Sequence, residues 1–455
     1  MALTGSGLLL GATPVGAAMG ARVPAGGGGP QPGAVPAAQG GGIQLFEDTT
    51  LNFQALYGLG SAGYGSSEVG EMSVAVDATN AAGPGVASFS NAFRSVADQV
   101  SQSAHAALRA GRPVTARSRF LRAAEYYAQS LFFVLGTDDP GSERDLFATM
   151  RDNWEKAGKL FDPRIEKVRI PYQRSSMPGY FLRPDNSGRR RPTVIVNNGS
   201  DGQSIEIYPF GPAAAVERGW NALILEGPGQ GAMLFEREIP FRPDWEKVIT
   251  PVVDYLVDRD DVDRDRIALT GWSMAGELVT RAAAFERRLA AVVADPGSVD
   301  TFRAWGQLQS VADAGDAATV NAIWQNEIAP GLPPDQVFML KKRGEIFSKQ
   351  ALQQARQGQL FTDFAAVADV AKRIKVSDEV IRRVRAPMLV VDYELEQFYP
   401  GQAQELFDKL RSPKDLVSLG AANGAQYHCA PMAPQYRNEV VFDWLEDKLD
   451  IKSER

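Results

Sequence analysis

The feature that most constrains the fold is a series of short apolar runs separated by helical segments. These runs predict buried strands at residues 194–196, 222–225, 267–269, 291–293, 388–391 and 416–419. Between two of them, apolar residues recur every three or four positions from Trp245 to Leu256, which is typical of an amphipathic helix. Strands buried on both faces and joined by helices form a mainly parallel sheet with helices on both sides. Residues 168–172 and 179–182 predict an antiparallel pair ahead of this α/β pattern.

Other regions flank or interrupt the α/β pattern, which we assign to residues 163–299 and 388–455. Residues 44–162 predict a mainly helical domain, with clear helical spacing from Phe89 to Phe161, although residues 44–84 are weakly patterned. Residues 300–387 also look wholly helical and are too long for a plain crossover, so we expect a cap insertion there. Residues 1–43 are rich in Gly, Ala and Pro and predict a flexible leader.

The leader leaves the location of the protein open. Its apolar stretch from Leu8 to Gly20 resembles the apolar half of a signal peptide, but the first basic residue is Arg22. A partial signal peptide of an exported protein and a plain Ala/Gly tail of a cytoplasmic one are both compatible with it.

Composition narrows the classes of partner. The 455 residues carry a formal net charge of −7 and include no long basic stretch, so we expect no nucleic-acid partner. No run reaches the roughly 18 apolar residues that a membrane span requires. One cysteine, Cys429, and two histidines leave no transition-metal cluster to predict, so we expect no metal and assign Cys429 to core packing. The run Gly227 to Ala232 formally matches a dinucleotide fingerprint, but Pro240 and Pro243 interrupt the helix that should follow, and we expect no cofactor.

A nucleophile is predicted at Ser273. The sequence Gly271-Trp272-Ser273-Met274-Ala275-Gly276 follows the strand at 267–269 and is close to the G-x-S-x-G elbow, in which a strand turns sharply into a helix. Such a turn exposes the serine hydroxyl and aims the backbone N–H of Met274 at a developing oxyanion. Ala275 departs from the pattern, since a second glycine is expected there.

A base is predicted at His428, which lies between the strand at 416–419 and the last helix. The other histidine, His105, lies among alanines inside a predicted helix and is assigned a structural or exposed role. Three acids follow the strand at 388–391, and Glu396 fits best because the orienting acid usually stands beyond the strand end. Asp392 and Glu394 are the alternatives.

The second oxyanion donor is expected from the loop 197–202, which follows the strand at 194–196. We favour the backbone N–H of Ser200; the alternative is that the loop is only a glycine-rich turn.

The chain order serine, acid, histidine is that of α/β-hydrolases, and further sequence motifs resemble one branch of that family. The branch contains 2,6-dihydroxypseudooxynicotine hydrolase and the fungal polyketide-shortening hydrolase of pigment synthesis. The resemblance rests on the elbow and on four segments spread from the helical region to the predicted base, namely 122–127, 227–231, 241–245 and 425–428. It covers about Phe89 to Leu449 and implies an α/β-hydrolase fold, a Ser–acid–His triad without a cofactor, cleavage of esters or of C–C bonds next to carbonyls, and a homodimer.

We therefore expect a cofactor-free serine hydrolase acting on a small carbonyl substrate, such as an ester, a β-diketone or polyketide-like compound, or an aryl ketone. The alternatives are a lyase that uses His428 as the base of an elimination, and a non-catalytic binding protein with the same fold. We also expect segments 89–161 and 300–387 to roof the site, with Trp305, Phe338 and Phe361 lining an apolar pocket.

Overall fold

The computed structural model describes residues 42–451, and the predicted flexible leader with its signal-like stretch lies almost entirely outside the described residues. Eight strands form one sheet in the order β1-β2-β4-β3-β5-β6-β7-β8. Their bounds are β1 Glu166–Tyr172, β2 Ser175–Leu182, β3 Arg191–Asn197, β4 Asn221–Leu225, β5 Val262–Trp272, β6 Ala291–Asp295, β7 Met388–Tyr393 and β8 Lys414–Leu419. All eight predicted strands are therefore present.

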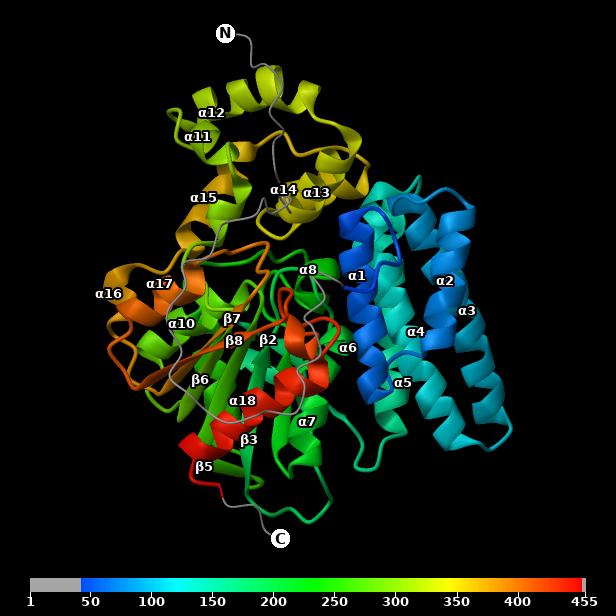
Figure 1. Ribbon diagram of the computed structural model, residues 1–455, viewed down its shortest axis with the longest axis vertical. Helices are drawn as coiled ribbons and strands as arrows, with labels where there is room; N and C mark the ends of the chain where they lie inside the picture. Colours follow the sequence, from blue (N-terminus) through cyan, green and yellow to red (C-terminus); the bar gives the residue numbers. More distant parts are fainter. Residues whose placement is uncertain (1–41, 452–455) are drawn as a thin grey trace, which may run out of the picture.

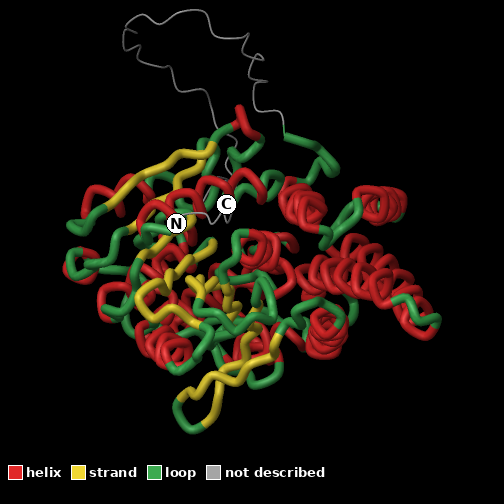
Figure 2. Tube along the Cα trace, turned by 90° about the horizontal axis from the view of Figure 1, so that it is seen from below, coloured by secondary structure: helices red, strands yellow, loops and turns green. Residues whose placement is uncertain are grey.

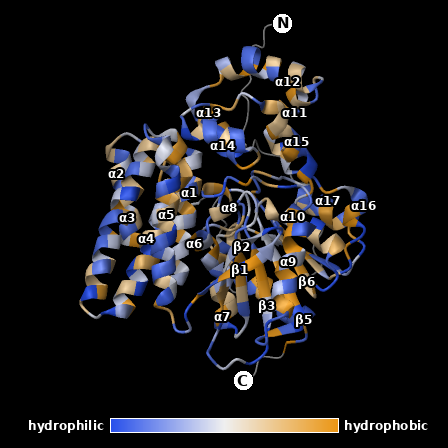
Figure 3. Cartoon of the chain, turned by 180° about the vertical axis from the view of Figure 1, so that it is seen from behind, coloured by the Kyte–Doolittle hydropathy of each residue, from blue (hydrophilic) through white to orange (hydrophobic). Residues whose placement is uncertain are grey.

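Strand directions agree with the sequence patterns. The first pair, β1 and β2, is antiparallel, and β2 joins β4 in the antiparallel sense. From β4 through β8 all neighbours are parallel. The central strands are apolar without alternation because both faces of the sheet are covered. One face of the sheet is covered by α7 (Pro212–Glu217) and α18 (Pro434–Lys448) (Figure 1). The other face is covered by α9 (Glu246–Val257) and α10 (Ala275–Phe285). Figure 3, coloured by hydropathy, shows the apolar strands from this second side. The predicted fold class is confirmed.

Five helices precede the sheet and lie side by side (Figure 2). They are α1 Thr49–Gly60, α2 Val69–Ala81, α3 Val86–Arg109, α4 Pro113–Phe133 and α5 Glu143–Lys159. The weakly patterned region 44–84 thus contains α1 and α2. Consecutive positions of α1 from Gln54 to Gly58 are buried, so this helix has no single apolar stripe that a periodicity argument could detect. The domain boundaries at 162/163 and 299/300 remain predictions.

The segment between β6 and β7 is helical, as expected, and stands above the sheet in Figure 1. It contains α11 Leu308–Ala312, α12 Ala317–Ile323, α13 Pro334–Glu345, α14 Lys349–Arg356, α15 Phe364–Ile374 and α16 Asp378–Ile381. Within residues 42–451, no helix has the length and apolar character needed to cross a membrane.

The three aromatic residues expected to line a pocket are instead core residues, so that prediction is wrong. Trp305, Phe338 and Phe361 are at most 6% exposed. Phe361 stacks on Trp324 with ring centroids 5.2 Å apart, and Phe338 stacks on Phe133 of α4 at 5.5 Å. A small helical insertion must bury its largest side chains to acquire a core of its own, which leaves fewer of them for a pocket wall.

Candidate active site

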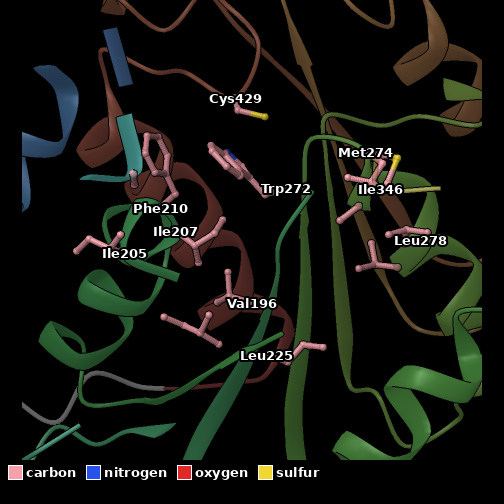
Figure 4. Close-up of a cluster of buried hydrophobic side chains, with 14 of the residues drawn as sticks. Val196, Ile205, Ile207, Phe210, Leu225, Trp272, Met274, Leu278, Ile346 and Cys429 are labelled. Carbon is pink, nitrogen blue, oxygen red and sulfur yellow. The ribbon is translucent and has the colours of Figure 1, made fainter. Parts of the chain in front are cut away.

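Ser273 occupies a strained turn between β5 and α10. Its φ of +59° lies in the left-handed region that side-chain-bearing residues rarely adopt. A Cβ built on Gly271 would collide with the carbonyl oxygen of Ala275, and one built on Gly276 would collide with that of Pro296. The close approach expected from a glycine at 275 is therefore made by its neighbour Gly276. Figure 4 shows the residues flanking Ser273 packed on both sides, with Trp272 near Phe210 and Met274 near Leu278 and Ile346.

Asp295, at the end of β6, is hydrogen-bonded to this turn. Its carbonyl oxygen accepts a hydrogen bond of 2.7 Å from the Ser273 N–H and one of 3.6 Å from the thiol of Cys429. Its buried carboxylate accepts from Arg437 Nε at 2.6 Å and from the Tyr393 hydroxyl. One residue thus connects the Ser273 turn, the turn after His428 and helix α18. Cys429 is fully buried, and burial raises the pKa of its thiol.

His428 lies between Ser273 and Glu396. Its Nε2 is 2.9 Å from Ser273 Oγ, and its Nδ1 is 2.8 Å from each carboxylate oxygen of Glu396. The side chains of His428 and Glu396 are only 4% and 3% exposed. Proton transfer from serine to imidazole requires a distance of about 2.6–3.2 Å, so this chain of three groups has the geometry of a nucleophile, a base and an orienting acid.

Of the three acids that follow β7, Glu396 is the one beside the imidazole. Asp392 still belongs to the strand and pairs with Ser418 of β8. Glu394 is exposed and accepts a hydrogen bond from the Ala421 N–H. His105 lies on α3, where its ring is 3.2 Å from Lys156 Nζ. The three acids are two positions apart, so a continuous strand would place them on one side; because β7 ends at Tyr393, Glu394 and Glu396 lie on the turn beyond it and point elsewhere.

Burial alone would raise the pKa of the Glu396 carboxyl, but the adjacent His428 outweighs it and the net pKa is lowered. The backbone N–H groups of Phe398 and Tyr399, which donate at 2.9 and 3.1 Å, act in the same direction because they stabilise the charged form. The carboxylate is therefore ionised at neutral pH and can balance an imidazolium charge.

The predicted oxyanion donors are the backbone N–H groups of Met274 and Ser200. Within residues 42–451, neither the N–H of Met274 nor that of Ser200 donates a hydrogen bond to the protein. Gly199 brings the loop close, since a Cβ built on it would lie 2.7 Å from Ser273 Cβ. Its own N–H donates to the Asn198 side chain at 2.7 Å.

The loop 197–202 is held by side chains that the sequence patterns did not identify as functional. Gln230 Nε2 donates to the carbonyl oxygens of Asn198 and Gly199 at 2.5 and 3.0 Å. The run 227–232, which formally matched a dinucleotide fingerprint, therefore brings Gln230 into contact with this loop. From the insertion, Arg343 of α13 bonds Ser200 Oγ at 3.0 Å and forms an ion pair with Asp201. Burial would raise the pKa of Asp201, but Arg343 reverses this and lowers it.

A cavity of about 670 Å³ opens onto Ser273 and His428. This volume is within the range of sites that bind small molecules. Its walls are mostly apolar and aromatic, and they include Phe46, Phe53, Leu56, Tyr57, Phe132, Trp272, Met339, Leu395, Phe398, Tyr399 and Tyr427. Polar side chains line it as well, among them Gln54, Asp201, Glu206 and Arg343. Burial raises the pKa of Glu206 to about 7. The expectation that the segment 89–161 roofs the site is wrong, because it contributes only Phe132 to the lining. Residues 42–57, which include most of α1, line the cavity instead, and the insertion contributes Met339 and Arg343 of α13.

A second cleft of about 730 Å³ lies between the β1–β2 turn and residues 228–244, and neither Ser273 nor His428 lines it. In the described part of the chain, no three His, Cys, Asp or Glu side chains are placed to hold a metal ion.

The buried carboxyl of Glu277, one turn after Ser273 on α10, is expected to make the stability of the folded protein depend on pH. Burial raises its pKa to about 8, and it accepts hydrogen bonds from Thr301 N and Oγ at 3.0 and 2.6 Å. A carboxyl with a raised pKa in the folded state binds more protons than in the unfolded state, so stability falls as pH rises from about 4.5 to 8. Glu277→Gln should reduce this pH-dependent decrease in the free energy of unfolding by on the order of 3 kcal/mol. Urea unfolding of both proteins at pH 5 and pH 8 measures it, and identical pH dependence would contradict it.

Comparisons with known proteins agree with this architecture. The sequence profile described as the alpha/beta hydrolase family matches residues 198–441. The hydrolase ORFZ of Pyricularia oryzae is 31% identical over 430 residues, which cover 90% of this chain and 98% of that protein. The 20-hydroxy-prefusarin hydrolase FUS2 of Gibberella moniliformis is 30% identical over 269 residues, which cover 57% of this chain and 63% of that protein.

Among solved structures, the 2,6-dihydroxy-pseudo-oxynicotine hydrolase superposes with a TM-score of 0.60 at 20% identity, covering 86% of this chain and 95% of that one. At this identity the likeness concerns the fold. It extends beyond the sheet, because 86% of this chain could not be covered without the helical regions as well.

Proposed function

This chain belongs to the alpha/beta hydrolase family and is a hydrolase, and we propose that it is a cofactor-free serine hydrolase whose nucleophile, base and acid are Ser273, His428 and Glu396. The observation that carries the proposal is the continuous contact from Ser273 Oγ through both ring nitrogens of His428 to Glu396, next to a cavity of substrate size. A structural serine needs neither a strained backbone nor a buried imidazole at 2.9 Å.

The proposed reaction proceeds in two halves. Ser273 Oγ attacks the substrate carbonyl while its proton passes to His428 Nε2, and the tetrahedral oxyanion accepts hydrogen bonds from the N–H groups of Met274 and Ser200. When the intermediate collapses, His428 returns that proton to the leaving oxygen or carbon. Water then attacks the acyl-enzyme while His428 takes its proton; His428 returns this proton to Ser273 Oγ as the C–O bond to the serine breaks and the acid product leaves.

The proposed substrate is a small, mainly apolar carbonyl compound. The aromatic walls of the cavity favour an apolar body, and the group around Arg343 and Glu206 offers hydrogen bonds to one polar end. The name 20-hydroxy-prefusarin hydrolase supports a hydroxylated natural product as one example of such a compound. Both an ester and a C–C bond beside a carbonyl fit this description.

A product analysis in ¹⁸O-labelled water tests the reaction class. Esters and β-diketones are offered in parallel, and the products are examined by mass spectrometry. Hydrolysis through an acyl-enzyme incorporates one label into the acid product, whereas an elimination with His428 as base incorporates none. Labelling of the wild type but not of Ser273→Ala by a fluorophosphonate probe tests the nucleophile independently of any substrate.

Phe53 of α1 is expected to select substrates by size. Its ring lies 5.5 Å from that of Phe398 and 6.5 Å from that of His428. Phe53→Ala should therefore raise kcat/KM for bulky relative to short acyl chains by about tenfold, as expected for one pocket contact. The matched control is Phe361→Ala, which removes a buried ring of the insertion core and should cost about 3–5 kcal/mol of stability without changing that ratio. An unchanged chain-length preference in Phe53→Ala would contradict the assignment of this wall.

A further inference from the structure

We propose that helix α1 helps to position the active-site residues, and that Tyr57 on this helix is a positioning residue which holds the turn carrying His428. This inference rests on the proposed function, because it assigns Tyr57 a role through His428. Helix α1 precedes the segment matched by the family profile and lies beside the hydrolase core, next to the other N-terminal helices (Figure 1).

The contact that carries the proposal is direct. The Tyr57 hydroxyl donates a hydrogen bond of 2.8 Å to the backbone carbonyl oxygen of His428. The Tyr57 ring is itself fixed, with its centroid 5.3 Å from Trp272 and 5.7 Å from Phe210 in edge-to-face contacts. Because Trp272 immediately precedes Ser273, one aromatic side chain touches both the residue before the nucleophile and the backbone of the base.

The turn after His428 needs such support because its backbone is strained. Cys429 and Ala430 both have positive φ values, of 59° and 48°, although neither is a glycine. Such conformations cost on the order of 1–3 kcal/mol each and persist only where the surroundings hold them. Three contacts hold this turn: Tyr57 donates to the His428 carbonyl, the Gln397 side chain accepts the His428 N–H at 3.3 Å, and the Cys429 thiol donates to the Asp295 carbonyl.

A second, independent contact joins α1 to the same turn. Gly60, at the end of the helix, lies against the backbone of Pro431 so closely that a Cβ built on it would collide with the Pro431 carbonyl oxygen. The helix therefore contacts the turn at two points one helical turn apart. If Tyr57 releases the carbonyl of His428, the imidazole can move away from Ser273 Oγ, and a displacement of about 1 Å costs on the order of a hundredfold in rate.

The test compares Tyr57→Phe with Tyr126→Phe, a matched control that removes a buried hydroxyl from α4 bonded to Glu71. Steady-state kinetics use a p-nitrophenyl ester, and kcat is expressed per site titrated to completion with a fluorophosphonate, so that loss of folded protein cannot imitate a catalytic defect. We expect Tyr57→Phe to lower kcat by about ten- to a hundredfold and to slow labelling in proportion, with KM nearly unchanged. Tyr126→Phe should retain the wild-type kcat and labelling rate.

A second pair of variants tests the contact between Gly60 and the backbone of Pro431 in the turn after His428. Gly60→Ala should lower kcat per titrated site, whereas Gly70→Ala, on α2 with open space around its Cβ position, should not. Wild-type kcat and labelling rates in both Tyr57→Phe and Gly60→Ala would overturn the inference while leaving the proposed function intact. Wild-type turnover in Ser273→Ala would instead overturn the proposed function itself.

Discussion

Replacing Ser273 or His428 by alanine is expected to abolish turnover while leaving the fold intact. The two side chains meet at 2.9 Å, and each is useless to the proposed reaction without the other. Residues that act as such a unit lose about 10³- to 10⁶-fold in kcat when either is removed, and the losses do not add. The double variant should therefore be about as inactive as either single one.

The measurement is kcat on the best ester or diketone substrate, accompanied by circular dichroism and a thermal melt of each variant. His105, on α3, lies beside Lys156 of α5 and provides the internal control: His105→Ala should retain activity. Retention of more than about a tenth of the activity in His428→Ala would contradict the proposed base, given the size of loss that a triad histidine produces.

Replacing Glu396 by glutamine is expected to lower kcat by about 10³- to 10⁴-fold, as loss of the orienting charge does in other serine triads. Glutamine keeps the size of the side chain but carries no charge to balance an imidazolium, and its amide can favour the wrong tautomer of His428. The effect should fall mainly on kcat, because Glu396 is buried behind the imidazole.

Two neighbouring acids provide matched controls for this variant. Asp392→Asn and Glu394→Gln remove the same charge within four residues of Glu396, yet neither side chain bonds His428. Each should change kcat little. If Asp392→Asn is the inactive variant, the orienting acid has been misassigned.

Much of the architecture could be predicted because local patterns are sufficient for it. Continuous apolar runs such as 194–196 and 222–225 predicted buried parallel strands, and the structure contains them at β3 and β4. The elbow around Ser273 was also visible, since a tight strand-to-helix turn demands small residues at fixed offsets. Chain order and a shortage of histidines then indicated His428 and the acids after β7.

The pocket could not be predicted in the same way. Trp305, Phe338 and Phe361 look suitable for an apolar wall, yet they form the core of the insertion and its contact with α4. The residues that do line the cavity include Phe53, from a helix whose sequence has no amphipathic stripe. Composition cannot distinguish an aromatic ring in a core from one in a wall, because both positions select the same side chains.

What the sequence by itself determined is the sheet, the helical insertion and the turn at Ser273, all of which depend on residues close together in the chain. Only the tertiary structure decided that Glu396, rather than Asp392 or Glu394, faces His428. The same is true of Tyr57, which reaches a carbonyl oxygen 371 positions away. Such contacts depend on the angles at which packed elements meet, and a one-residue change of direction along a strand or loop turns a side chain to the opposite side. Periodicity along the chain carries no information about those angles.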